Sequence, residues 1–120
     1  MSEPTKSVHF ISLGCPKNRI DTETMLAGLP DARYSLTPNI EGADVVVVDG
    51  AEGGTGASPE MLLNHTGIPT MSAIRAAREA LDDCGMTGKV SLVAAGGIRS
   101  GVDAAKCIAL GADAVMIGNA

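Results

Sequence analysis

Two glycine-rich loops follow the last two predicted strands and have the composition of a phosphate site. One loop comes after the apolar stretch Val90–Ala95 and the other after Ala114–Ile117. Glycine lets backbone N–H groups converge on an anion, and a helix beginning near Ser100 would point its positive end at the same place. The alternative is that the glycines only make a tight strand-to-helix turn. The predicted phosphate site consists of Gly96, Gly97, Ile98, Gly118 and Asn119.

A third glycine-rich loop lies at Gly50–Ser58 and holds four glycines. Its central residues could form a second anion-binding nest of backbone N–H groups. No Lys-Ser/Thr pair follows it, so it is not a Walker loop, and it does not match GxGxxG. A flexible loop without a ligand is the alternative. The candidate cofactor contacts here are Gly53, Gly54 and Thr55.

Groups capable of nucleophilic catalysis are few. Cys15 precedes a predicted helix and lies near Lys17 and Arg19, which favours the thiolate, although a cysteine without a role is the alternative. Neither His9 nor His65 has a Ser or Cys at a recognisable spacing, so we predict no nucleophilic triad. We therefore assign no catalytic residue.

The three cysteines also argue against a metal site. They are odd in number and form no CxxC pair, which indicates reduced thiols in a cytoplasm-like compartment. Cys84 and Cys107 fall in predicted helices, where we expect small core residues.

Length and composition describe one domain over residues 1–120. The net charge of −5 and the presence of only two aromatic residues argue against a nucleic acid or an anionic membrane as partner. No apolar run approaches the ~20 residues of a membrane span, and the N-terminus has no apolar signal core.

Strand and helix signals alternate along the chain. The strand signals are Val8–Leu13, Arg33–Thr37, Ala43–Asp49, Val90–Ala95 and Ala114–Ile117. Helices are expected from Asn18 to about Leu29, from Ser72 to about Cys84 and from Ser100 to about Leu110. This order predicts an α/β fold: a flavodoxin-like three-layer sandwich with a parallel sheet ordered 2-1-3-4-5. A closed barrel would need about 250 residues.

Some covering helices are missing from this pattern. Only the six residues Pro38–Ala43 separate the second and third strands, too few for a crossover helix. No helix signal follows the fifth strand. One face of the sheet is therefore expected to be poorly covered, and we predict that two chains pair through it as a homodimer. The alternative is that Met1–Lys6 or the long segment Ala51–Met71 folds over this face.

Residues 8–48 closely resemble the N-terminal domain of the ribosomal-protein methylthiotransferases. The specific run is Ser-Leu-Gly-Cys-Pro-Lys-Asn at residues 12–18. The resemblance implies that Cys15 stands where that family has one of three cysteines that hold an iron–sulfur cluster. The second ligand should follow the valine strand, yet this chain continues as Asp49-Gly50-Ala51. We therefore expect no cluster.

Residues 43–120 resemble another family, the FMN-binding barrel domain of glutamate synthase. The matching runs include Gly-Gly-Thr-Gly-Ala-Ser-Pro-Glu, Ala-Gly-Gly-Ile-Arg-Ser-Gly and Gly-Ala-Asp-Ala-Val-Met-Ile-Gly. The match corresponds to the last three strands of an eight-stranded barrel. It implies that the FMN phosphate lies between the loops at residues 96–98 and 118–119, with the loop at residues 53–55 near the flavin.

The two resemblances overlap in Ala43–Val48, which suggests a crossover point. We interpret the chain as an engineered or recombined α/β chimera without a complete active site, retaining at most a pocket for phosphate or FMN phosphate. A fragment of a glutamate-synthase-type flavin oxidoreductase is the first alternative. A structural scaffold without a ligand is the second.

Overall fold

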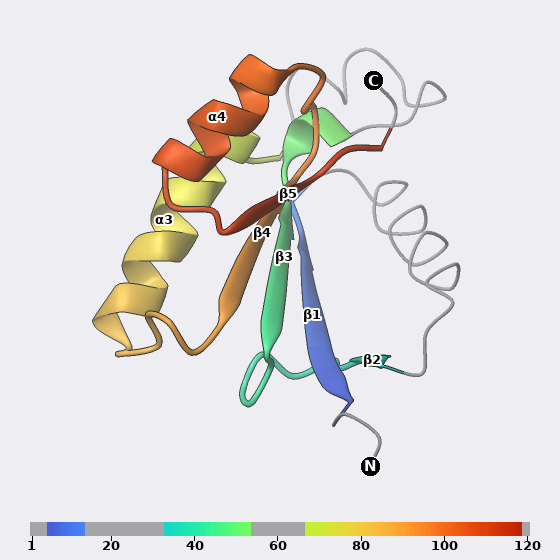
Figure 1. Cartoon of the computed structure of the whole chain (residues 1–120), viewed down its shortest axis with the longest axis vertical. Helices are drawn as coiled ribbons and strands as arrows, with labels where there is room; N and C mark the ends of the chain where they lie inside the picture. The colour runs from blue at the N-terminus through green and yellow to red at the C-terminus, as the bar shows by residue number, and fades with distance from the viewer. Residues whose placement is uncertain (1–4, 14–32, 54–66, 119–120) are drawn as a thin grey trace.

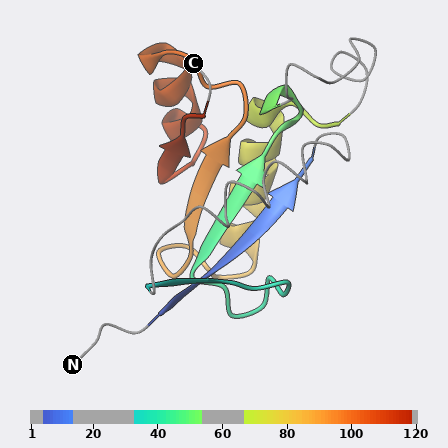
Figure 2. The same cartoon turned by 90° about the vertical axis from the view of Figure 1, so that its right-hand side faces the viewer.

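The computed structural model describes residues 5–13, 33–53 and 67–118. Their five strands form one sheet in the order β2-β1-β3-β4-β5, and every pair of neighbours is parallel (Figures 1 and 2). The strands are β1 (Lys6–Ser12), β2 (Tyr34–Leu36), β3 (Val45–Asp49), β4 (Ser91–Ala95) and β5 (Ala114–Met116). The predicted fold class and strand order are confirmed.

Side chains alternate between the two faces of the sheet, as strand geometry requires. In β3, Val46 and Val48 belong to a core cluster on one face, whereas Val47 belongs to a smaller cluster on the other. All three are buried. The valine run is therefore a central strand with both faces buried, as predicted from its continuous apolar sequence.

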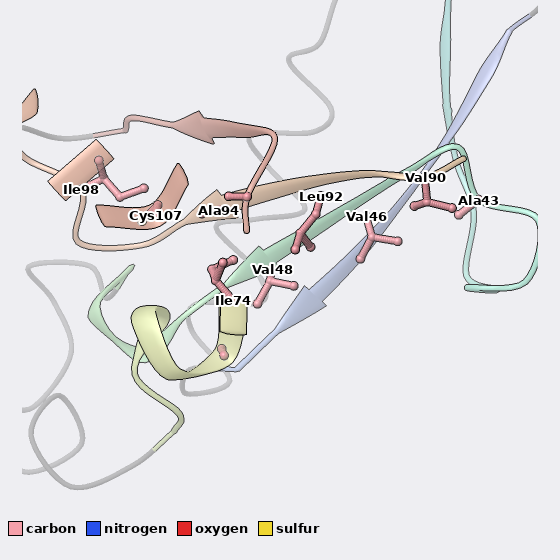
Figure 3. Close-up of a cluster of buried hydrophobic side chains, with 11 residues drawn as sticks. Ala43, Val46, Val48, Ile74, Val90, Leu92, Ala94, Ile98 and Cys107 are labelled. Atoms are coloured by element: carbon pink, nitrogen blue, oxygen red, sulfur yellow. The ribbon is translucent and has the colours of Figure 1, made fainter. Parts of the chain in front are cut away.

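The two α-helices of the described residues, α3 (Thr70–Asp83) and α4 (Gly101–Ala109), cover the same face of the sheet (Figure 1). The helix predicted at residues 18–29 lies outside the described residues. The main core fills the space between these helices and β3 and β4 (Figure 3). Its most completely buried side chains are Ile74, Leu92, Val48 and Cys107.

Arg78 joins α3 to the turn that precedes β5. Its Nε donates to the Gly111 carbonyl over 2.8 Å, and its Nη2 lies 3.0 Å from Asp113 Oδ2. The same Asp113 oxygen accepts the Leu92 backbone N–H at 2.8 Å. This chain of bonds fixes the helix layer to two strands, β4 and β5.

The start of α3 differs from the prediction. The helix begins at Thr70, with Pro69 as N-cap and no hydrogen bond from the side chain of the cap. Ser72 is therefore not the cap, because the side chain that satisfies the first helical N–H comes from Glu52, which is distant in sequence. Gly85 ends the helix region with φ +70°, as expected of a glycine terminator.

The start of α4 agrees with the prediction. Ser100 is the N-cap, and its hydroxyl accepts the Asp103 N–H at 3.2 Å. Asp103 Oδ2 in turn accepts the Ser100 N–H at 3.1 Å. This reciprocal capping box satisfies N–H groups that a helix end leaves without partners.

The expectation for the cysteines holds for one of the two described residues. Cys107 lies in α4 and is fully buried in the core, and burial raises the pKa of its thiol. Cys84 is exposed, so its prediction as a core residue is wrong. It is the C-cap of α3, where the chain turns away from the core toward Gly85.

The short crossover from β2 to β3 contains no helix, as predicted, and hydrogen bonds hold it against β1. Thr37 N–H donates to the Val8 carbonyl at 2.9 Å. At the other end, the Ser7 N–H donates to Asp44 Oδ2 at 2.8 Å. These hydrogen bonds fix the crossover to β1 without a helix.

Candidate functional site

The carboxyl ends of β3 and β4 meet in a compact cluster that includes the start of α3. A short 3-10 helix, Ala51–Gly53, follows β3 and carries Glu52. Glu52 Oε2 accepts both the backbone N–H and the hydroxyl of Thr70, at 2.8 and 2.7 Å. Thr70 Oγ1 also lies 2.9 Å from the Gly96 carbonyl. One buried threonine thus connects the two candidate loops.

Glycines make this close approach possible. A Cβ on Gly97 would lie 2.6 Å from the Glu52 Cβ, and a Cβ on Gly53 would lie 3.2 Å from the Gly96 Cα. Gly96 and Gly97 also adopt φ values of +100° and +70°, which side-chain-bearing residues rarely adopt. The loops at Gly53 and at Gly96–Gly97, predicted separately, therefore lie against each other.

Two backbone N–H groups at this turn are available to bind a ligand. Within the described residues, the backbone N–H groups of Gly97 and Ile98 take part in no hydrogen bond. Ile98 is buried, with a relative exposure of 3%, whereas Gly97 is exposed. Buried backbone donors are nearly always satisfied by protein, water or a ligand. The N–H of Gly97, the second of the two glycines with positive φ, and the N–H of Ile98 after it form a backbone cradle suited to an anion.

Two carboxylates limit what this cradle can hold. Glu52 packs against Gly97, and Asp103 occupies the start of α4, where its Oδ2 accepts the Arg99 N–H at 3.1 Å. The hydrogen bond from Arg99, followed by that from the Ser100 hydroxyl, lowers the pKa of Asp103. Asp103 is thus an anion already placed at the helix end. The hydrogen bonds to a phosphate would therefore have to come from Gly97, Ile98 and the loop after β5.

The last predicted loop lies beside this cradle. Ala95 and Met116 are register partners in β4 and β5, so the chain segments that follow them leave the sheet side by side. Gly118 is exposed, and a Cβ there would meet no atom within 4 Å. The structure therefore brings Gly96, Gly97 and Ile98 near the start of the second loop. Asn119, Gly54 and Thr55 lie outside the described residues.

The site contains residues that sequence analysis did not assign. Glu52 and Thr70 are 18 positions apart, and no local pattern marks their contact. Ser12 is the last residue of β1 and pairs in register with Asp49 at the same sheet edge. Its hydroxyl is buried and has no hydrogen-bond partner. The signal that could have identified Ser12 is its place at the end of a predicted parallel strand.

His9 lies apart from these residues. Its Nδ1 is 2.9 Å from the Thr37 carbonyl, so this nitrogen must carry the proton, because a carbonyl only accepts. It borders a shallow hollow of about 450 Å³ whose other lining residues all come from the β2–β3 crossover, Pro38, Asn39, Ile40 and Glu41. No serine or cysteine lines that hollow.

The described residues hold neither a metal-binding cluster nor a membrane-spanning helix. Residues 5–13, 33–53 and 67–118 contain no group of three or more His, Cys, Asp or Glu side chains arranged to hold a metal ion. No helix in these same ranges is long and apolar enough to cross a membrane.

Comparison with known families gives a match over most of the chain. A family model described as the conserved region in glutamate synthase matches residues 27–120. This match begins earlier than Ala43, where the sequence resemblance begins.

Individual relatives carry the same relationship. A glutamate synthase large subunit-like protein of Rhizobium meliloti is 58% identical over 79 residues, which cover 66% of this chain and 18% of that protein. An archaeal glutamate synthase [NADPH] of Methanocaldococcus jannaschii is 51% identical over 78 residues, 65% of this chain and 15% of that protein. The chain thus spans less than a fifth of the length of these relatives.

A second relationship covers a smaller part. The ribosomal protein uS12 methylthiotransferase RimO of Pseudomonas paraeruginosa is 51% identical over 49 residues, 41% of this chain and 11% of that protein. Two unrelated enzyme families therefore each match part of one chain, as the sequence motifs indicate.

Proposed function

The chain belongs to the family defined by the conserved region in glutamate synthase, and from this premise we propose that its glycine loops bind the phosphate group of FMN. In this proposal the backbone N–H groups of Gly97 and Ile98 donate hydrogen bonds to the phosphate. Gly96 and Gly118 shape the two loops, and Asn119 is the next residue of the second loop. Gly53, Gly54 and Thr55 are the proposed contacts with the flavin part of FMN. The chain carries no complete active site in this proposal.

The two N–H groups of Gly97 and Ile98 carry this proposal. They are adjacent, and no described residue accepts a hydrogen bond from either. An anion in front of them would satisfy both donors, and hydrogen bonds from N–H groups to a charged acceptor are stronger than those to a neutral one. When bound, FMN supplies redox chemistry; the residues of this chain bind and orient its phosphate.

The test compares FMN binding in two variants that add the same side chain. Gly118→Val should weaken FMN binding about tenfold, because the added side chain would occupy space that we propose for the phosphate, and losing one hydrogen bond to the charged phosphate costs about 1.5–3 kcal/mol. Ala76→Val, on an exposed position of α3, should leave the affinity unchanged. Flavin fluorescence quenching measures the affinity, and inorganic phosphate should compete.

Two results would remove the site from consideration. One is an equal FMN affinity in wild type and Gly118→Val. The other is FMN binding that saturating phosphate does not reduce. Gly97→Val is less informative, because its side chain would collide with Glu52 and disturb the fold as well as the site.

The glutamate-synthase relatives support a second candidate, a fragment of a flavin oxidoreductase that works with parts supplied by other segments. Turnover of glutamine and 2-oxoglutarate separates this candidate from the first. A structural scaffold, the third candidate, would bind neither FMN nor phosphate.

We also propose that the chain arose by recombination or engineering at β3. Two families match different parts of the sequence, and both resemblances contain Ala43–Val48.

For the location of the protein we propose a reducing, cytoplasm-like compartment, which the free cysteines Cys84 and Cys107 support.

A homodimer remains our proposal for the assembly. Val102 on α4 and Ile117 after β5 are 64% and 54% exposed. Pairing two chains through the sheet face that α3 and α4 do not cover, with β5 and α4 near the interface, would remove apolar side chains from water and gain about 25 cal/mol per Å² of apolar surface. Light scattering should give about twice the 12.1 kDa of one chain at micromolar concentration. A mass that stays at 12.1 kDa as the concentration rises contradicts the dimer.

A further inference from the structure

The hydroxyl of Ser12 is a buried polar group that the fold does not explain. Among the buried side-chain oxygen and nitrogen atoms of the described residues, only Ser12 Oγ has no hydrogen-bond partner. Leaving such a group unpaired costs free energy, and a native structure usually keeps it for a bound water, an ion or a ligand. Ser7 provides a contrast on the same strand, because its hydroxyl donates to the Gly42 carbonyl at 3.1 Å.

Ser12 lies where an open parallel sheet binds ligands. The chain goes outward from β1 to β2 in one direction and from β3 to β4 and β5 in the other, so the strand order reverses between β1 and β3. Ligands of open α/β sheets bind outside the carboxyl ends of the strands at this reversal. β1 and β3 lie side by side in the sheet (Figure 2), and their last residues, Ser12 and Asp49, are register partners.

A row of register partners across the sheet runs from Ser12 to the strand end where the proposed phosphate cradle begins. Ser12 pairs with Asp49, Asp49 with Ala95, and Ala95 with Met116. Paired residues of parallel strands direct their side chains to the same face, here the one opposite α3 and α4. With neighbouring strands about 4.8 Å apart, Ser12 is roughly 10 Å along the row from the end of β4, where the cradle begins.

We propose that Ser12 binds a hydroxyl group of the ligand whose phosphate occupies the Gly97–Ile98 cradle. The ligand class is then a phosphate ester of a polyol, since a polyol chain offers hydroxyls along the row between the two sites. The serine hydroxyl both donates and accepts, which suits a ligand hydroxyl. This inference rests on the proposed phosphate site. Ser12 lies in the methylthiotransferase-like part, so the glutamate-synthase-like part does not provide this contact by itself.

The test measures two ligands on the full chain. Ser12→Ala should weaken binding of FMN about five- to tenfold and leave the affinity for inorganic phosphate unchanged, because phosphate does not reach β1. Ser12→Cys, which keeps a weak donor of similar size, should fall between wild type and Ser12→Ala. Without ligand, Ser12→Ala should unfold at the same or a higher temperature than wild type, since it removes an unpaired buried hydroxyl.

Ser7→Ala is the matched control on β1. It removes a bonded hydroxyl and should lower the unfolding temperature while leaving FMN affinity unchanged.

Each other outcome has a defined meaning. Equal FMN affinity in wild type and Ser12→Ala overturns the role of Ser12 and leaves the phosphate site standing. Binding of phosphate without binding of FMN does the same. A wild-type chain that binds neither ligand overturns both the phosphate site and the inference built on it.

Discussion

Replacing Gly50 with alanine should destabilise the protein by about 3 kcal/mol or more, because overpacking at a rigid contact costs at least the upper part of the usual 1–3 kcal/mol. The new Cβ would overlap Thr70 Oγ1 and would lie 2.5 Å from the Thr70 Cα and 2.6 Å from its N. Neither side can easily move. Gly50 N–H donates to the Ala95 carbonyl at 3.0 Å, and Glu52 holds Thr70 by two hydrogen bonds.

The matched control is Gly101→Ala at the start of α4, where a Cβ meets nothing within 4 Å. Its unfolding free energy should stay within about 0.5 kcal/mol of wild type, as for most surface substitutions. Urea denaturation followed by circular dichroism measures both variants. Equal midpoints for Gly50→Ala and Gly101→Ala would mean that the contact between β3 and α3 is not as close as described.

The sheet could be predicted from sequence because its signals are local and agree with one another. Four consecutive valines at residues 45–48 indicated a central strand, and alternation of strands with helices indicated parallel pairing. Ser100 could be predicted as a cap from its residue type, and the structure shows that its hydroxyl accepts an N–H only three positions away. Such features depend on a few neighbouring residues, so the sequence contains them directly.

The start of α3 could not be predicted in this way. Ser72 has the residue type of a cap, but the carboxylate that satisfies Thr70 belongs to Glu52 in another loop. The exposure of Cys84 likewise depends on where the last turn of α3 lies relative to the sheet. A residue type in a helix does not reveal the direction of its side chain at a helix end.

The candidate site was predictable as a place and not as a set of contacts. Parallel strands end at one edge, so the loops after β4 and β5 had to lie together, and the register pair Ala95–Met116 agrees. The unpaired hydroxyl of Ser12 and the contact of Glu52 with Gly97 arise from packing between distant segments. Only the folded chain brings those groups within reach of one another.

Truncating Leu92 should produce the other large loss of stability. Leu92 lies in β4 with a relative exposure of 0%, in the core between the sheet and the helices (Figure 3). Leu92→Ala removes buried methyl groups and leaves a cavity, which costs about 2–5 kcal/mol. That is a large part of the ~5–15 kcal/mol by which a typical domain is stable.

Leu36→Ala is the control for Leu92→Ala, because it makes the same substitution in another strand of the same sheet. Leu36 lies on the edge strand β2 and is 54% exposed, so little apolar surface returns to water when it is truncated. We expect a loss below about 1 kcal/mol for Leu36→Ala. Chemical denaturation of both variants decides the matter. Losses of similar size would contradict a core centred on β3 and β4, because burial is the main difference between the two leucines.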